Sequence, residues 1–131
     1  MAPYKPQRGE VYKANLNPPE GTDPGREYAG DWKTVLVIQH DKLNRNYSTV
    51  IVVPLTTTLK HARLPSTVEL ARIPGGILTE PCVALCHQLR VLDTGKLRQF
   101  CGKLSASDMA RVSEMVSHVL ALSPPPLKGE S

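Results

Sequence analysis

Hydroxyl-bearing and cationic side chains gather in two stretches of the 131-residue chain. The first stretch lies in and after a run of Gly, Pro and Asp residues, and the second follows a β-branched run. Their members are Asp23, Arg26, Glu27, Trp32 and Lys33 in the first stretch and Thr56, Thr57, Thr58, Lys60, His61 and Arg63 in the second. Two cations beside a hydroxyl would form a site for an oxyanion, and phosphate is the obvious example.

The two stretches are expected to meet at one end of a β-sheet. Residues 34–39 form a continuous apolar run and residues 48–56 are rich in β-branched side chains, so both are predicted strands. If these strands pair in an antiparallel manner, the start of one lies beside the end of the other. Lys33 and Thr56 then come close together.

Each of these residues also has a plainer interpretation. Arg26, Lys60 and Arg63 could be ordinary solvated surface charges, and a threonine in a strand is common. Trp32 either stacks on a base or fills a hydrophobic gap. Without outside knowledge, the residues support a basic, β-rich, single-domain protein that binds anions.

Short strands followed by one helix must position these residues. Further strands are predicted at residues 9–16, 66–70, 83–92 and 100–104, with loops at 17–31, 40–47 and 57–65. Pro54 indicates that its strand bends or reaches an edge there. Ser105 begins a helix with an apolar stripe made of Met109, Val112, Val116, Val119 and Leu120. We therefore predict a mainly β fold, a small barrel with a C-terminal helix.

Length and charge set limits on the class of protein. A chain of 14.4 kDa is expected to form one domain over residues 1–131, with flexible tails at 1–7 and 123–131. The net charge of +4 suits a polyanionic partner. No apolar run approaches the roughly 20 residues of a membrane helix, and the first residues do not resemble a signal peptide. We expect a cytoplasmic protein with no membrane partner.

Signatures of several enzyme classes are absent. The sequence has no GxSxG, Walker, HExxH or GxGxxG motif, and its four histidines are scattered singly. Three cysteines without a CxxC pair argue against a disulfide framework or a structural zinc site, so burial is expected for Cys82, Cys86 and Cys101.

At these residues the chain resembles the MazF/PemK family of toxins from toxin–antitoxin modules. The ordered match runs from about residue 8 to residue 122. The matching segments are RGEVY at residues 8–12, GTDPG at 21–25, VLVIQ at 35–39, TVIVVPLT at 49–56, ARLP at 62–65, VALCHQLR at 83–90, and Leu104 and Ser105 with the helix. No one segment is specific, but their order is.

The resemblance implies an SH3-like barrel, a homodimer and a cognate antitoxin that covers a basic groove with an acidic, partly disordered segment. It implies cleavage of single-stranded RNA, such as mRNA, without metal or cofactor. The 2′-OH would attack the adjacent phosphate and leave a 2′,3′-cyclic phosphate and a 5′-OH. Thr56 matches the family's catalytic threonine, and Asp23 matches an acidic residue with a role in substrate positioning or proton transfer. The implied RNA contacts are Trp32, His40, Thr57, Lys60, His61, Arg63, Leu64 and Gln88.

The chain departs from the family pattern at one catalytic position. The family usually has Arg-Pro directly before the VLV strand, and that arginine is catalytic, whereas Lys33 and Thr34 stand here. Either Lys33 supplies the catalytic cation or Arg26 folds back from the preceding loop to supply it. We favour both acting in one pocket. Lysine is a point charge and lacks the planar fork of arginine.

Two other functions stay open. The same fold carries toxins that poison gyrase and have no nuclease site. A catalytically inactive RNA-binding relative is the other alternative.

Overall fold

The computed structural model describes residues 5–16, 32–71 and 80–122, apart from the side chain of His61. Its strands are β1 (Glu10–Asn15), β2 (Trp32–Val37), β3 (Thr49–Thr56), β4 (Thr67–Leu70), β5 (Cys82–Leu85), β6 (Arg90–Asp93) and β7 (Leu97–Lys103). Its helices are α1 (Asp41–Asn46) and α2 (Ala106–Val119), and its 3-10 turns are η1 (Leu59–Arg63), η2 (Cys86–Gln88) and η3 (Thr94–Lys96).

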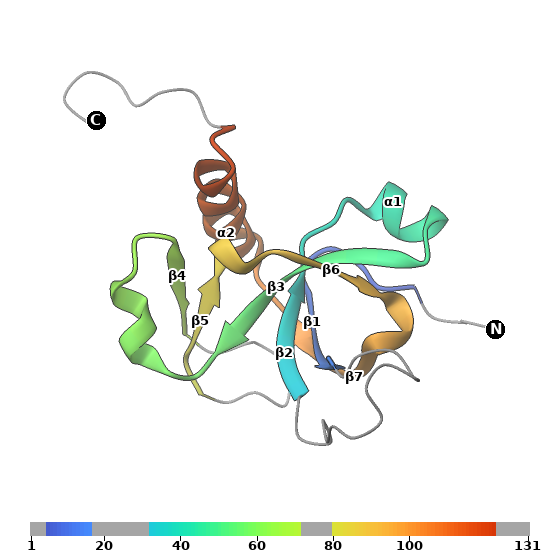
Figure 1. Cartoon of the computed structure of the whole chain (residues 1–131), viewed down its shortest axis with the longest axis horizontal. Coiled ribbons are helices and arrows are strands. Elements are labelled where there is room, and N and C mark those ends of the chain that lie inside the picture. Colours follow the sequence, from blue (N-terminus) through green and yellow to red (C-terminus); the bar gives the residue numbers. More distant parts are fainter. Residues whose placement is uncertain (1–4, 17–31, 72–79, 123–131) are drawn as a thin grey trace, which may run out of the picture.

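One antiparallel sheet holds all seven strands, in the order β4-β5-β3-β2-β1-β7 with β6 also paired to β3. Figure 1 shows the sheet curving around its central strands, with α2 rising from one side. The predicted fold class, mainly antiparallel β with a C-terminal helix, is confirmed. Chain neighbours β2 and β3 pair directly, so both segments predicted to carry the site belong to the middle of the sheet.

Strand alternation divides the apolar side chains between two cores. The first lies between the sheet and α2, and its members include Val11, Leu36, Val53, Leu55, Leu70, Ala84 and Val112. The second lies on the other face of the central strands and contains Tyr12, Ala14, Val35, Val37, Val50, Val52 and Leu92. Strands β1, β2 and β3 contribute side chains to both cores because successive residues of a strand point to opposite faces.

Burial of the three cysteines is confirmed. Cys82, Cys86 and Cys101 are free thiols in the first core. Among the described residues, no group of His, Cys, Asp and Glu could hold a metal ion. No helix in the described part of the chain is long and apolar enough to cross a membrane.

The single strand predicted at residues 83–92 is wrong, because two strands separated by η2 occupy this segment. Leu55 pairs with Ala84 and Val52 pairs with Arg90, so residues 85–89 face only residues 53 and 54 of β3. The extra residues bulge into a 3-10 turn. Pro54 lies at this interruption, where a missing N–H removes no bond to a strand. Of the two alternatives predicted at Pro54, a bend or an edge, the edge is wrong, since β3 has strands on both sides.

Helix α1 was not predicted in the polar segment at residues 40–47. His40 caps the helix because its Nδ1 accepts the Lys42 N–H, with 3.0 Å between the two nitrogens. Asn44 is buried and bonds to both Gln39 and Asp41. Polar side chains that satisfy one another therefore replace the apolar stripe that usually reveals a helix.

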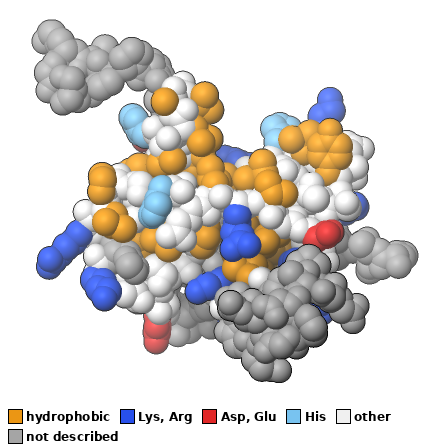
Figure 2. Space-filling view, viewed as in Figure 1, with side chains coloured by type: hydrophobic (Ala, Val, Ile, Leu, Met, Phe, Trp, Pro, Cys, Tyr) orange, Lys and Arg blue, Asp and Glu red, His pale blue; other side chains and the backbone are white. Residues whose placement is uncertain are grey.

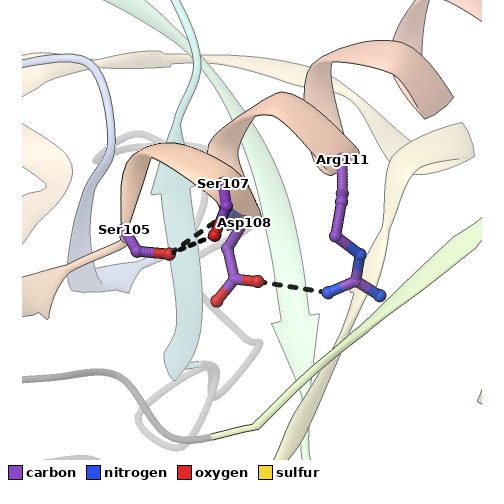
Figure 3. A network of polar contacts seen from close by, with 4 residues as sticks. All are labelled: Ser105, Ser107, Asp108 and Arg111. Carbon is purple, nitrogen blue, oxygen red and sulfur yellow. Dashed lines mark hydrogen bonds and ion pairs between the residues drawn. The ribbon is translucent and has the colours of Figure 1, made fainter.

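Helix α2 begins as predicted after Ser105. The Ser105 hydroxyl accepts the Asp108 N–H at 3.2 Å, and Figure 3 shows this cap beside Ser107. The Asp108 carboxylate does not complete a capping box. It instead accepts from the guanidinium of Arg111 at 3.1 Å. The cap satisfies one of the N–H groups that the first turn of a helix leaves without a partner.

Candidate functional site

Lys33 and Thr56 occupy the same end of two paired strands. Thr34 and Leu55 are partners in the register of β2 and β3, so Lys33 and Thr56 are the next residues along the two strands. Both belong to strands at these positions, since Lys33 pairs with Ala14 and Thr56 pairs with Val83. The structure therefore brings these two predicted site residues together at one end of the sheet.

The two side chains also share a face. Opposite residues of an antiparallel pair point to the same side of the sheet. Alternation from Val35 places Lys33 on the face of the second core, and alternation from Val52 places Thr56 there as well. Lys33 is exposed and Thr56 is partly exposed, so the buried second core ends before them and their polar atoms can reach a solute.

A local turn orients the Thr56 hydroxyl. Its Oγ1 accepts the Thr58 N–H at 3.1 Å, a threonine turn that fixes the side chain at the end of β3. A hydroxyl that accepts a bond keeps its own hydrogen to donate. Within the described part of the chain, no acceptor takes that hydrogen.

Beyond Thr56, η1 presents cations and apolar groups on an ordered turn. Lys60 and Arg63 are exposed, and neither forms an ion pair with a described carboxylate. Leu64 follows, and its carbonyl oxygen accepts from the hydroxyl of Thr67 at 2.8 Å, which ties the turn to β4. On the face drawn in Figure 2, several Lys and Arg side chains stand out and few acidic ones are seen.

The turn η2 brings Gln88 to the surface. Gln88 and His87 are both exposed, and Ser66 Oγ lies 2.7 Å from His87 Nδ1. The Cys86 N–H also donates to the carbonyl oxygen of Ser66 at 3.1 Å. Ser66 and His87 were missed by sequence reasoning because they lie 21 residues apart and neither forms part of a known motif.

Other predicted residues are placed differently. Trp32 opens β2 and is 45% exposed, so it does not fill a gap in the described core. Thr57 is exposed directly after β3. His40 lies beyond the opposite end of β2 from Lys33, where it caps α1. Asp23 and Arg26 lie outside the described residues, as does the side chain of His61.

One exposed cation on the same face escaped the sequence-based prediction. Arg90 of β6 pairs with Val52, which belongs to the second core. The alternation rule therefore puts Arg90 on the face that carries Lys33 and Thr56. Val52 and Thr56 are four residues apart, or about 13 Å along a strand. Only the register shows this relation, because the bulge at η2 breaks the pattern that would have revealed it.

The fold is a small antiparallel sheet with a C-terminal helix, and an exposed cation and a hydroxyl lie at adjacent strand ends. A cation and a hydroxyl donor placed together are groups that suit an oxyanion. The sequence pattern of the family described as "PemK-like, MazF-like toxin of type II toxin-antitoxin system" matches residues 7–120. The chain belongs to this family.

Individual relatives agree with this membership. The chain is 32% identical over 116 residues to a protein named Endoribonuclease MazF from Staphylococcus saprophyticus, covering 88% of this chain and 92% of the relative. It is 33% identical over the same shares to a protein of that name from Staphylococcus epidermidis.

Solved structures share the fold. An endoribonuclease from Mycobacterial species superposes with a TM-score of 0.68 at 23% identity, covering 93% of this chain and 97% of that one. MazF from Deinococcus radiodurans superposes with a TM-score of 0.66 at 21% identity, covering 90% of this chain and 98% of that one.

Proposed function

We propose that the chain is a toxin endoribonuclease that cuts single-stranded RNA without a metal ion. The observation that carries this proposal is the placement of Lys33 and Thr56 on one face at the end of β2 and β3. The relatives named Endoribonuclease MazF support it. A cation beside a hydroxyl donor is the pair of groups that an attacked phosphodiester needs.

The reaction is an internal phosphoryl transfer within the RNA. The 2′-oxygen of one ribose bonds to the adjacent phosphorus, and the bond from phosphorus to the 5′-oxygen of the next nucleotide breaks. One proton leaves the 2′-OH and one proton reaches the departing oxygen. The products carry a 2′,3′-cyclic phosphate and a 5′-OH. Because the nucleophile is already tethered to its target, positioning and charge stabilisation suffice for catalysis.

Each site residue has a role in this proposal. The ammonium of Lys33 neutralises charge that builds on the phosphoryl oxygens, and the Thr56 hydroxyl donates to one of them. Arg26 shares the neutralisation with Lys33. Asp23 positions the substrate or takes part in proton transfer.

Exposed groups on and around the sheet hold the RNA. Lys60 and Arg63 contact its backbone, while Trp32 stacks on a base. Gln88 contacts a base edge. Thr57, His61 and Leu64 complete the surface. The family resemblance also implies an RNA contact for His40, which lies beyond the far end of β2.

The partners follow from the same family. A related structure is described as an endoribonuclease in complex with its cognate antitoxin, from Mycobacterial species. We propose that this chain forms a homodimer and that a cognate antitoxin neutralises it with an acidic segment. Such a segment would fold as it covers the cations that otherwise hold RNA.

The test is cleavage in EDTA. Purified protein is incubated with a mixed-sequence single-stranded RNA, and the fragment ends are analysed for cyclic phosphate and 5′-OH. Cutting with those ends supports the proposal. An intact RNA, together with inhibition of gyrase supercoiling by the same preparation, would favour the gyrase poison instead. Binding without cutting or gyrase inhibition would favour the inactive relative.

A further inference from the structure

Three side chains form a hydrogen-bonded chain from the start of β4 to η2. Ser66 Oγ lies 2.7 Å from His87 Nδ1, and His87 Nε2 lies 3.4 Å from Gln88 Nε2. The carbonyl oxygen of Ser66 also accepts the Cys86 N–H. Ser66 thus holds both the backbone of η2 and the imidazole ring.

The partners decide where the protons lie. With its NH₂ group at this contact, the Gln88 amide donates and His87 Nε2 accepts, because an amide nitrogen does not accept a hydrogen bond. A neutral imidazole carries one proton, and that proton then resides on Nδ1. Nδ1–H donates to Ser66 Oγ, which fixes the ring. The shorter contact, from His87 to Ser66, is the stronger of the two.

This arrangement fixes the direction of the Gln88 amide. The nitrogen and oxygen of an amide lie on opposite sides of its carbon, so an Nε2 turned toward His87 leaves Oε1 turned away from the ring. Because Gln88 is exposed, this oxygen is available to a ligand as a hydrogen-bond acceptor. Its complement on a nucleobase is an exocyclic amine, as carried by adenine, cytosine or guanine.

We infer that Ser66 and His87 are positioning residues that turn the carbonyl oxygen of Gln88 toward the RNA, which makes the site prefer a base with an exocyclic amine. The inference rests on the proposed function and names a substrate feature for it. Without His87, the amide could rotate and present its NH₂ group equally well. It would then accept bases with or without the amine.

A merely structural role predicts something different. His87 and Gln88 are both exposed, and water competes for exposed hydrogen bonds, so their loss alters the stability of the fold little. Loss of packing would also slow the cutting of all RNAs alike. Loss of a positioning residue changes the ratio of the cutting rates of two RNAs that differ by one exocyclic amine.

The experiment first maps the cut site and then compares cutting of matched RNAs. At each position around the cut, inosine replaces guanosine, purine riboside replaces adenosine, or pyrimidin-2-one riboside replaces cytidine, which removes one exocyclic amine. At one position, wild type should cut the amine-bearing RNA about tenfold faster, the effect of one hydrogen bond to a base. Gln88→Met should abolish this ratio, which assigns it to Gln88.

The variants separate positioning from structure. His87→Asn keeps an amide group near the place of Nδ1 but leaves nothing at Nε2, and Ser66→Ala removes the hydroxyl. In both, the ratio should fall to about twofold or less. Ser66→Thr restores the hydroxyl and should keep the tenfold ratio. His118→Asn and Ser107→Ala, exposed on α2, are matched controls and should keep it as well.

The outcomes distinguish failure of this inference from failure of the proposed endoribonuclease function. If wild type cuts the amine-bearing RNA tenfold faster and both His87→Asn and Ser66→Ala keep this ratio of rates, the inference is overturned. The proposed nuclease function is then unaffected. A wild-type preference for the amine-free RNA also overturns it, because the NH₂ group would then face outward. No cutting of any RNA by wild type overturns the proposed function itself. Thermal unfolding shows whether each variant is folded. If Ser66→Ala does not fold, the result for His87→Asn decides the test.

Discussion

Thr34 of β2 faces Leu55 of β3, and this pairing makes Lys33 the neighbour of Thr56. The register is held by the cores on both faces, since Leu36 pairs with Val53 in the first core. A slip of one residue would exchange the faces of every side chain in the strand, and the buried valines forbid it. Hydrophobic packing therefore sets the position of the two polar groups to which the chemistry is assigned.

Lys33→Arg is expected to make the enzyme faster. A planar guanidinium can bind two phosphoryl oxygens at once, whereas an ammonium acts as a point charge. We expect a three- to tenfold gain in single-turnover rate, equivalent to roughly 1 kcal/mol of added stabilisation. Lys42→Arg on α1 is the matched control and should leave the rate unchanged. An equal or slower rate for Lys33→Arg would show that the cation at this position does not contact the phosphate.

The Ser105 cap should be measurable in the stability of the fold. Ser105→Ala removes the acceptor of the Asp108 N–H, which should lower the free energy of unfolding by about 1 kcal/mol. Ser107→Ala, two residues further along the same turn, should change it by less than about 0.5 kcal/mol. Urea denaturation of the two variants checks this. Equal losses would mean that the cap contributes nothing of its own.

Asp41 should make the fold sensitive to acid. The Arg8 N–H, donating at 2.7 Å, is the main reason that the pKa of Asp41 lies below its ordinary value of 3.8. A carboxyl whose folded pKa is lowered contributes stability above the ordinary pKa and loses it as the pH falls through the folded value. Unfolding free energy should therefore decline below pH 3.8. Asp41→Asn should lower stability at pH 7 by about 1 to 2 kcal/mol and reduce that decline. An unchanged slope in the variant would assign the decline to other carboxyls.

Buried thiols should be inert in the folded protein. Desolvation raises the pKa of Cys82 to about 11, with a further contribution from the charge of Asp108, and burial alone raises that of Cys86 to about 11. A thiol whose folded pKa is raised contributes stability below the ordinary value of 9.0, and this is lost as the pH rises toward 11. Iodoacetamide at pH 8 should label the cysteines only after denaturation. Rapid labelling of the native protein would contradict their burial.

The sequence was most informative where the burial of an element produces a regular order of apolar residues. Residues 48–56 predicted β3 because β-branched side chains run through it, and Ser105 predicted the start of α2 because its hydroxyl caps the helix. Lys33 and Thr56 could be placed together because two buried neighbouring strands have little freedom in register. These inferences depend on local preference and on the pairing of adjacent strands.

Departures from regular pattern escaped prediction. The bulge at η2 could not be predicted from residues 85–89 themselves. It arises because β3 changes its pairing partner from β6 to β5 along its length. Helix α1 was hidden because Asn44, a polar residue, is its buried member. The contact between Ser66 and His87 depends on both the bulge and the return of β4, so no local signal marks it.

The central claim is that Lys33 and Thr56 act on the same phosphodiester, and a double-mutant cycle tests it most directly. Single-turnover rates in EDTA are measured for wild type, Thr56→Ala, Lys33→Ala and the double variant. Thr49→Ala, at the far end of β3, serves as the control, and RNA affinity is measured in parallel. Each single change should lower the rate about a hundredfold, with RNA binding by Thr56→Ala nearly intact.

Groups that stabilise one transition state together are not additive. The double variant should therefore be only a few times slower than either single variant, roughly a few hundredfold below wild type. If the double variant instead loses the full product of the two effects, about ten-thousandfold, the two residues act independently. That result, or single variants that cut at the wild-type rate, would contradict a shared site at the end of β2 and β3.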